Sequence, residues 1–275
     1  MSIQRLDDAD VMHQFRLDGR VAFLSGATGH LGRFMAKALV EAGAHVVLNG
    51  RRKDALKIFA AELKKSGHHV STACFDVTDE DAVVRNISLI GKKHGRLDII
   101  VNNASQGRPG TIENTTRADF EQVFRVNVVA AGQIIQAAMP LLRESAKSTA
   151  GSSVVNIASM YGSVSSDSSI YGSSGAHNPP SYSAAKGGLI QLTRYAACHL
   201  AADRIRVNCI SPGPFPAQRY LENDPGFHDR LKAKVPMGRT GEPQELSGPL
   251  LFLASDASSY VTGINLAVDG GWTAW

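Results

Sequence analysis

The sequence lacks the features that would place the chain in a membrane or in a disulfide-stabilised class. No apolar run approaches the roughly 20 residues that a membrane-spanning helix needs, and the start MSIQRLDDADVMHQF lacks the charged-then-apolar order of a signal peptide. Only three cysteines occur, Cys74, Cys198 and Cys209, and they do not have metal-ligand spacing. We therefore expect a cytoplasmic protein with buried free thiols and no metal site.

A strong excess of charge of one sign is also missing. The net charge is +4 and the lysines and arginines are dispersed, so we expect no nucleic-acid partner and no membrane partner. The length of 275 residues with 43% hydrophobic residues suits a single domain over 1–275, with 1–16 as an N-terminal extension. Alternating strand and helix patterns predict a parallel sheet covered by helices on both faces.

A glycine-rich turn follows the first apolar run. The run 21–25 (VAFLS) leads directly into GATGHLG (26–32), and a helical pattern continues through Ala42 before a second predicted strand at 45–49. Glycines let the backbone approach a pyrophosphate, and the free N–H groups at a helix start favour its charge. The pattern predicts a dinucleotide-binding βαβ unit. The alternative is a structural turn without a ligand.

The end of the second predicted strand indicates which cofactor is used. A dehydrogenase that selects NAD has Asp or Glu here to bind the ribose 2′-hydroxyl, whereas Arg suits a 2′-phosphate. In this sequence Gly50 stands at that position, followed by Arg51 and Arg52 as phosphate donors. We predict NADP(H), with NAD as the weaker candidate. The alternative, a solvated basic helix start, would oppose the helix dipole.

A tyrosine and a lysine are spaced for proton transfer. Residues 181–201 are predicted to form a helix with Ser181 as N-cap, which places Tyr182 and Lys186 one turn apart on one face. A tyrosine ordinarily titrates near about pH 10, and a nearby ammonium lowers that value. Ser159, at the end of the predicted strand 153–158, could hold a substrate oxygen beside the phenol. Taken alone, the Tyr-x-x-x-Lys pattern also fits an ordinary surface helix.

The order of these motifs resembles the short-chain dehydrogenase/reductase family, in its compact single-domain branch, from about Leu17 to the end of the chain. The resemblance is carried by the glycine turn and by Asp76-Val77, Asn102-Asn103-Ala104, Asn127, Ser159, Tyr182 with Lys186, and Pro212-Gly213. It implies an α/β fold with a Rossmann-type doubly wound parallel sheet of about seven strands.

The resemblance implies four catalytic residues. Tyr182 would be the general acid/base, and Lys186 would lower its pKa and bond the nicotinamide ribose. Ser159 would orient the substrate carbonyl. Asn127 would hold a water that links Lys186 to solvent, a role that explains an asparagine inside the helical pattern FRVNVVAAGQII.

The cofactor site implied by the resemblance comprises Gly26, Thr28, Gly29, His30, Leu31, Gly32, Arg51, Arg52, Asp76, Val77, Asn103, Ala104, Ser105, Tyr182, Lys186, Pro212, Gly213 and Phe215. Asp76 could instead cap the helix that starts near 78–81, and Asn103-Ala104 could form an ordinary strand-to-helix turn.

Three positions depart from the family pattern. Ser25 replaces the usual threonine of the glycine turn, and Gly29 comes one residue early. His30 could therefore lie near the phosphates or face solvent. Ser105 replaces the glycine of Asn-Asn-Ala-Gly, which adds a side chain beside the nicotinamide ribose. None of these changes removes a group that hydride transfer needs.

Two segments are predicted to shape the substrate site. The polar stretch 160–181, an inserted loop near the active site, is longer than in most relatives and suits a lid, a subunit contact or a mobile insertion. The second segment is 211–236, with a predicted helix near 226–234. The candidate substrate contacts are Ser159, Tyr171, His177, Asn178 and Tyr182.

The substrate class follows from weaker signals. The glycine turn, the strand end LNGR and the segment SPGPFP are most similar to gluconate 5-dehydrogenase-like members, which act on sugar acids or polyols. A 3-oxoacyl-carrier-protein reductase is the competing enzyme. A non-catalytic NADP-binding regulatory or scaffold protein is the alternative of another class, and the retention of all four catalytic residues argues against it.

The C-terminal tail suggests assembly. A predicted last strand, 261–268, is followed by a short tail that carries Trp272 and Trp275. Large aromatic side chains on a free terminus are readily explained by burial in a partner, so we expect a homotetramer or a homodimer. The alternative is a tail that folds back on its own subunit.

Overall fold

The structure is a computed structural model that describes residues 10–172, 177–217 and 224–275. In these residues seven parallel strands form one sheet in the order β3-β2-β1-β4-β5-β6-β7. The strands are β1 (Val21–Leu24), β2 (His45–Gly50), β3 (Val70–Cys74), β4 (Ile99–Asn102), β5 (Ser152–Ile157), β6 (Ile205–Pro212) and β7 (Asn265–Val268). The predicted doubly wound sheet is confirmed, although the last strand is shorter than the predicted 261–268.

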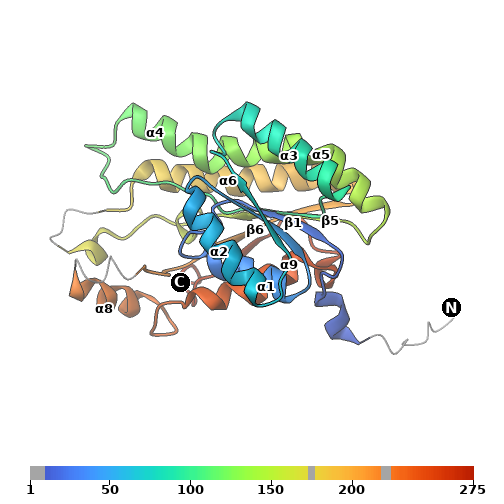
Figure 1. The fold of residues 1–275 in the computed structure, drawn as a ribbon. Helices are drawn as coiled ribbons and strands as arrows, with labels where there is room; N and C mark the ends of the chain where they lie inside the picture. The colour runs from blue at the N-terminus through green and yellow to red at the C-terminus, as the bar shows by residue number, and fades with distance from the viewer. Residues whose placement is uncertain (1–9, 173–176, 218–223) are drawn as a thin grey trace.

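Helices cover both faces of the sheet (Figure 1). One face carries α1 (Gly32–Glu41), α2 (Lys53–Lys65) and α9 (Ser247–Ala254), and the other carries α3 (Glu80–His94), α5 (Ala130–Lys147) and α6 (Pro180–Leu200). The short helix α4 (Arg117–Phe124) packs against α6, and α8 (Pro225–Lys234) lies beyond the sheet near the C-terminus (Figure 1). The chain crosses from β3 back to β4, which pairs with β1, so the strand order reverses between β1 and β4, where ligands bind in such folds.

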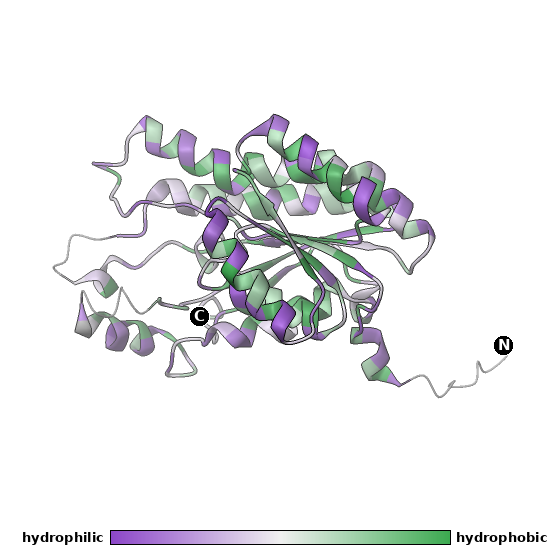
Figure 2. Ribbon diagram, in the orientation of Figure 1, coloured by the Kyte–Doolittle hydropathy of each residue, from purple (hydrophilic) through white to green (hydrophobic). Residues whose placement is uncertain are grey.

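The strands alternate between two apolar layers. Leu24 is fully buried in the layer with α1, α2 and α9, whereas Phe23 is fully buried in the layer with α3, α5 and α6. Figure 2 shows hydrophobic strands between helices whose outer faces are hydrophilic. Because both faces of a parallel sheet are buried, these strands consist of almost continuous apolar runs.

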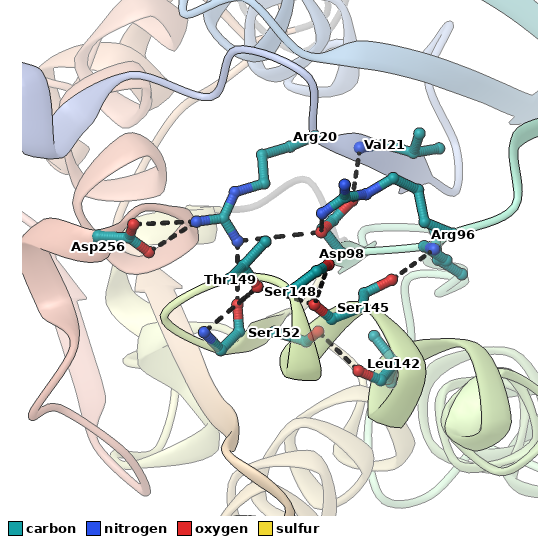
Figure 3. A network of polar contacts seen from close by, with 12 residues as sticks. Arg20, Val21, Arg96, Asp98, Leu142, Ser145, Ser148, Thr149, Ser152 and Asp256 are labelled. Carbon is teal, nitrogen blue, oxygen red and sulfur yellow. Dashed lines mark hydrogen bonds and ion pairs between the residues drawn. The ribbon is translucent and has the colours of Figure 1, made fainter.

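An ion-pair network closes the amino end of the sheet (Figure 3). Asp98 has no exposed surface, and its carboxylate accepts hydrogen bonds from the backbone N–H of Val21 at 2.8 Å and from Arg96 at 2.6 and 2.8 Å. Arg20 lies 3.9 Å from Asp98 and is paired with Asp256 at 2.9 Å. This network lies opposite the carboxyl ends of the strands, where the predicted site residues gather.

Two local predictions are wrong. Helix α6 begins at Pro180 with Pro179 as N-cap, so Ser181 is not the cap; proline suits the first helical position because its missing N–H would have no helical partner there. The thiols of Cys74 and Cys198 are exposed, and only Cys209 is buried. Cys74 ends the edge strand β3, and Cys198 lies near the C-terminal end of α6. Among the described residues, no helix is long and apolar enough to cross a bilayer.

Candidate active site

The glycine turn after β1 packs tightly against the end of β4. Gly26 has φ +64°, and a Cβ there would lie 3.0 Å from Asn103 Nδ2 and 3.1 Å from Ala104 Cα. A Cβ at Gly32 would lie 2.3 Å from the carbonyl oxygen of Gly26. Glycine is therefore required at both positions. Helix α1 starts at Gly32 with no side-chain hydrogen bond to cap it, which leaves its amino end suited to an anion.

The other predicted residues of the turn differ in exposure. Gly29 and His30 are exposed, Thr28 is half-buried, and Leu31 packs against the apolar layer of α1. A phosphate role for His30 stays a prediction.

Ser25 has a role that sequence reasoning missed. Its hydroxyl oxygen accepts hydrogen bonds from the backbone N–H groups of Asn103 at 2.9 Å and Ala104 at 3.0 Å. In return, Asn103 Nδ2 donates to the carbonyl oxygens of Ser25 at 3.0 Å and Gly26 at 3.1 Å. These four bonds join the carboxyl ends of β1 and β4 and set the start of the segment 103–107. The departure from threonine is visible in the sequence, but these partners are not.

A basic position borders the end of β2. Gly50 ends this strand, and Arg51 follows with 69% of its side chain exposed and its Nη1 3.6 Å from Asp76 Oδ2. Arg52 is exposed at the N-cap of α2. The guanidinium of Arg51 therefore lies near the end of β2, where the sequence predicts the 2′-phosphate, and position 50 supplies no carboxylate there.

Asp76 does not cap the following helix. The cap of α3 is Asp79, which accepts from the N–H of Ala82 at 2.9 Å. Asp76 Oδ1 instead accepts from the N–H and the hydroxyl of Thr78, both at 2.9 Å. Partial burial opposes ionisation, but these hydrogen bonds and the charge of Arg51 lower the pKa of Asp76 overall. The neighbouring Val77 is buried.

Asn127 lies in a single π-helical turn, Arg125–Val129, between α4 and α5. Only 2% of the residue is exposed. Its Nδ2 donates to the carbonyl oxygens of Gln106 at 2.8 Å and Val123 at 2.9 Å, and its Oδ1 accepts from the Ser105 hydroxyl at 2.6 Å. Turns of this kind are frequent at functional sites. The water-holding role of Asn127 stays a prediction.

The predicted catalytic pair lies beside the end of β5. Lys186 is 2% exposed, its Nζ donates to the carbonyl oxygen of Ile157 at 2.7 Å, and the same nitrogen lies 5.4 Å from the centre of the Tyr182 ring. Ser159 follows β5, and its hydroxyl accepts from the N–H of Tyr161 at 3.2 Å. Burial lowers the pKa of Lys186 to about 7, with a small opposing effect of Cys209.

The segment after Ser159 packs closely against α6, which carries Tyr182 and Lys186. A Cβ at Gly162, in the short turn η3 (Met160–Gly162), would lie 2.8 Å from the Lys186 carbonyl carbon. On the other side, a Cβ at Gly107 would lie 3.2 Å from Tyr182 Cδ2. Small residues thus let two backbone segments approach Tyr182 and Lys186 from β4 and β5.

Some described residues of the insertion 160–181 pack against the second substrate segment. Met160, Tyr161 and Ile170 are buried with Leu231 and Val235, from α8 and the residue after it, and with Trp272. Lys234 Nζ lies 2.6 Å from Asp167 Oδ2, and Arg230 Nε donates to the carbonyl oxygen of Ile170 at 2.8 Å. The predicted helix near 226–234 is confirmed as α8. The insertion therefore joins the second substrate segment, and its role as a lid or subunit contact stays a prediction.

Of the candidate substrate residues, Tyr171 and His177 lie side by side. The Tyr171 hydroxyl lies 3.4 Å from that of Tyr161, and the Tyr171 ring centre lies 5.2 Å from that of His177 and 5.8 Å from that of Phe227. Burial raises the pKa of both tyrosines. Asn178 donates from Nδ2 to the Ser183 hydroxyl at 2.8 Å, which ties the end of the insertion to α6. Sequence reasoning missed Tyr161, for which the only signal is its nearness to Ser159.

The tail prediction is wrong for one tryptophan. Trp272 is 8% exposed and packs edge-on against Tyr161 of its own subunit, with ring centres 6.3 Å apart, because the tail after β7 turns back over Val235 and Pro236. Trp275 is 78% exposed.

The last predicted cofactor residues lie where β6 ends. Gly213 donates its N–H to the carbonyl oxygen of Val268 at 2.9 Å, and a Cβ there would lie 2.5 Å from Asp269 Cα. Pro212 is buried, and the Phe215 ring packs against Gly241 and the core. Contacts of these residues with a cofactor stay predictions.

Comparison with known proteins agrees with this geometry. The family model described as enoyl-(acyl carrier protein) reductase matches residues 26–273. The gluconate 5-dehydrogenase of Gluconobacter oxydans is 36% identical over 261 residues, 94% of this chain and 96% of that protein. The rhamnolipids biosynthesis 3-oxoacyl-[acyl-carrier-protein] reductase of Pseudomonas aeruginosa is 34% identical over 260 residues, 94% of this chain and 98% of that protein. A gluconate 5-dehydrogenase from Burkholderia cenocepacia, crystallised with NADP and tartrate, has a TM-score of 0.87 at 30% identity, covering 97% of this chain and all of that one.

Proposed function

The chain belongs to the short-chain dehydrogenase/reductase family, and we propose that it interconverts a ketone and a secondary alcohol of a sugar acid or polyol with NADP(H). The observation that carries this proposal is the burial of the Lys186 ammonium group against the Tyr182 ring, beside the strand end that presents Ser159. Such an arrangement supports proton transfer to or from a substrate oxygen.

The residues present fit NADP(H). The turn at Gly26 and Gly32 has no room for side chains, and the uncapped amino end of α1 suits a pyrophosphate. Arg51 and Arg52 would bind the 2′-phosphate, which a carboxylate at position 50 would repel. When bound, the nicotinamide supplies or accepts the hydride.

The protein's own residues would handle the proton. Tyr182 would donate a proton to the carbonyl oxygen during reduction, while the Ser159 hydroxyl holds that oxygen in line. Lys186, with a pKa of about 7, would exchange protons readily near neutral pH and favour the ionised phenol when charged.

Two observations support a polyhydroxylated substrate. Gluconate 5-dehydrogenases are similar over almost their full length, in sequence and in structure. The hydroxyl pair of Tyr161 and Tyr171 lies within the insertion, and Tyr161 is hydrogen-bonded to Ser159, so polar groups of the insertion could meet substrate hydroxyls.

A 3-oxoacyl thioester is the second candidate substrate. It is favoured by the similarity to the Pseudomonas aeruginosa reductase, which extends over 98% of that protein. The two substrates differ in charge and apolar length, so direct assays separate them.

Exposure of Trp275 also supports the proposal that the protein is a homotetramer or a homodimer. Light scattering of the purified protein and of a Trp275→Ser variant would test this, since a contact through Trp275 would weaken in the variant.

The central test is NADPH oxidation with 5-ketogluconate, other sugar-derived ketones, simple ketones and 3-oxoacyl thioesters. We expect turnover with 5-ketogluconate, and we expect Tyr182→Phe to lower kcat by about 10²–10⁴-fold while cofactor binding, followed by NADPH fluorescence, is retained. Tyr195→Phe is the matched control, because Tyr195 is on the same helix and 67% exposed. Full turnover in Tyr182→Phe would refute the mechanism, and exclusive turnover of thioesters would replace the substrate class.

A further inference from the structure

Ser105 is the residue that replaces a glycine of the family pattern, and its hydroxyl donates to Asn127 Oδ1 at 2.6 Å. We infer that Ser105 is a positioning residue for proton transfer, which acts through Asn127 to fix the segment 103–107 against Tyr182. The inference rests on the proposed function, because it assigns a purpose to a contact within that site.

The amide of Asn127 has only one way to lie. Its Nδ2 faces two acceptors, the carbonyl oxygens of Gln106 and Val123, so its Oδ1 must face Ser105. Asn127 itself is 2% exposed, so its position is set by these protein partners. Removal of the Ser105 hydroxyl would leave the oxygen without its bond to the segment 103–107, and a water in its place would not tie Asn127 to that segment.

The segment 103–107 is held at successive points. Ser25 receives the N–H groups at its start, and Asn127 binds its middle through the Ser105 hydroxyl and the Gln106 carbonyl oxygen. At its end the backbone of Gly107 lies against Tyr182, because a Cβ there would be 3.2 Å from Cδ2 of the ring.

The middle attachment is therefore the one nearest to the catalytic ring along the segment. A glycine at 105 would keep the bond to Gln106 and lose the bond from the hydroxyl, which would let the segment move relative to the ring. The Ser105 hydroxyl therefore gives the segment a second bond to Asn127. With glycine at 105, only the Gln106 carbonyl oxygen would bind Asn127.

The inference predicts a kinetic effect with a defined pattern. Ser105→Ala should lower kcat about tenfold, since the segment that lies against the Tyr182 ring loses one of its hydrogen-bond attachments, and should shift the pH midpoint of kcat, because the surroundings of Tyr182 change. The KM for NADPH should stay within about threefold if the effect is on the proton-transfer geometry. Ser105→Gly should behave like Ser105→Ala, and Ser105→Thr, which keeps the hydroxyl at an exposed position, should restore activity.

Ser148→Ala is the matched control. The Ser148 hydroxyl also makes one short-range bond, to the Ser145 carbonyl oxygen at 3.1 Å, but it follows the last residue of α5, away from the site. Its kcat and pH midpoint should equal those of the wild type. Equal effects of the two alanine variants would overturn the inference.

A double-mutant cycle tests the route through Asn127. In an Asn127→Ala background, or in Asn127→Ser if the alanine variant does not fold, Ser105→Ala should cause little further loss of kcat. The same loss in both backgrounds would refute the coupling.

Failure of this inference differs from failure of the proposed function. Retained turnover in Tyr182→Phe would remove the proposed mechanism itself. An inactive Tyr182→Phe together with an unaffected Ser105→Ala would leave the mechanism standing and reject the role of Ser105 alone.

Discussion

Buried polar groups have different kinds of partner at the two ends of the sheet. At the amino end, the Asp98 carboxylate receives the Val21 N–H and the Arg96 guanidinium, and Arg20 bridges toward Asp256 (Figure 3). Each charge of this network faces a charge of opposite sign. Such an arrangement compensates the loss of hydration and holds the strand ends in place.

At the carboxyl end the compensation is incomplete. Lys186 is buried, and its ammonium group donates to a neutral carbonyl oxygen, that of Ile157. Asn102 Oδ1 is buried without a hydrogen-bond partner among the described residues, and its side chain borders a small cavity with Ser25 and Asn127. Groups of this kind reduce stability but provide reactivity. The amino end thus stabilises the fold, and the carboxyl end holds the less compensated polar groups, where we propose that the reaction takes place.

Disruption of the amino-end network should have the greatest consequence. Asp98→Ala leaves the partly buried Arg96 without its ionic partner and the buried Val21 N–H without its acceptor, so we expect a loss of about 3–5 kcal/mol in the free energy of unfolding, with nearly unchanged kcat in the folded fraction. Urea unfolding followed by circular dichroism measures the loss, and Asp98→Asn serves if the alanine variant does not fold. The control is Glu121→Gln in the exposed pair with Arg117 at 2.7 Å, which should cost about 0–1 kcal/mol. Similar losses in both variants would contradict the structural role of the network.

At the carboxyl end of the sheet, Lys186→Met should change stability and activity in opposite directions. The pKa of Lys186 is about 7 in the folded protein, against 10.5 for an unperturbed lysine. Between about pH 7 and pH 10.5 the lysine of the unfolded chain is protonated more often than that of the folded protein. The free energy of unfolding of the wild type therefore rises with pH over this range.

The Met variant should therefore be inactive and, at pH 7, more stable than the wild type, and its advantage should shrink by at most about 1.4 kcal/mol per pH unit as the pH rises. Unfolding in urea at pH 7, 8 and 9 measures this. Lys37→Met, at an exposed site, should show no such trend, and a constant difference for Lys186→Met would argue against a lowered pKa.

Features encoded by neighbouring residues can be predicted from the sequence. The first βαβ unit is predictable because the apolar run, the glycines and the helical pattern follow each other within 21–49, and Tyr182 and Lys186 fall on one helix face by spacing alone. The confirmed sheet of seven strands follows from the same kind of local alternation. The ordered motifs also lead to the correct family.

Features that depend on distant contacts could not be predicted. Trp272 packs on Tyr161, more than a hundred residues away, and the aromatic residue alone does not show whether its cover is its own subunit or another. The side chain of Asn127 in the π-helical turn binds the Ser105 hydroxyl, which donates to it, and the Gln106 carbonyl oxygen, which accepts from it, and both partners lie more than twenty residues away in the sequence. The exposure of Cys74 depends on its place on an edge strand, which only the strand order reveals.

Arg51 has an ionic partner, as the charged residues of the amino-end network do, but it lies at the carboxyl end of the sheet. Its Nη1 is 3.6 Å from Asp76 Oδ2, and most of its side chain is exposed. Such a pair contributes little to stability, so its guanidinium can turn to a phosphate at low cost. Arg51→Asp should lower the ratio of kcat/KM for NADPH to that for NADH by about 10–100-fold, because it removes a phosphate donor and adds a repelling charge. Steady-state kinetics with both cofactors measures the ratio.

The control for this prediction is Lys57→Asp, which makes the same change in net charge on the exposed side of α2. A contact with the 2′-phosphate falls off within a few ångströms, whereas a general field is shared by neighbouring charges and is screened by salt. A local role of Arg51 therefore requires a large change in the ratio for Arg51→Asp and little change for Lys57→Asp at about 0.15 M salt. An equal change of the ratio in both variants would mean that the overall positive charge around the start of α2 sets the cofactor preference. No single residue at the carboxyl end of the sheet would then select the cofactor.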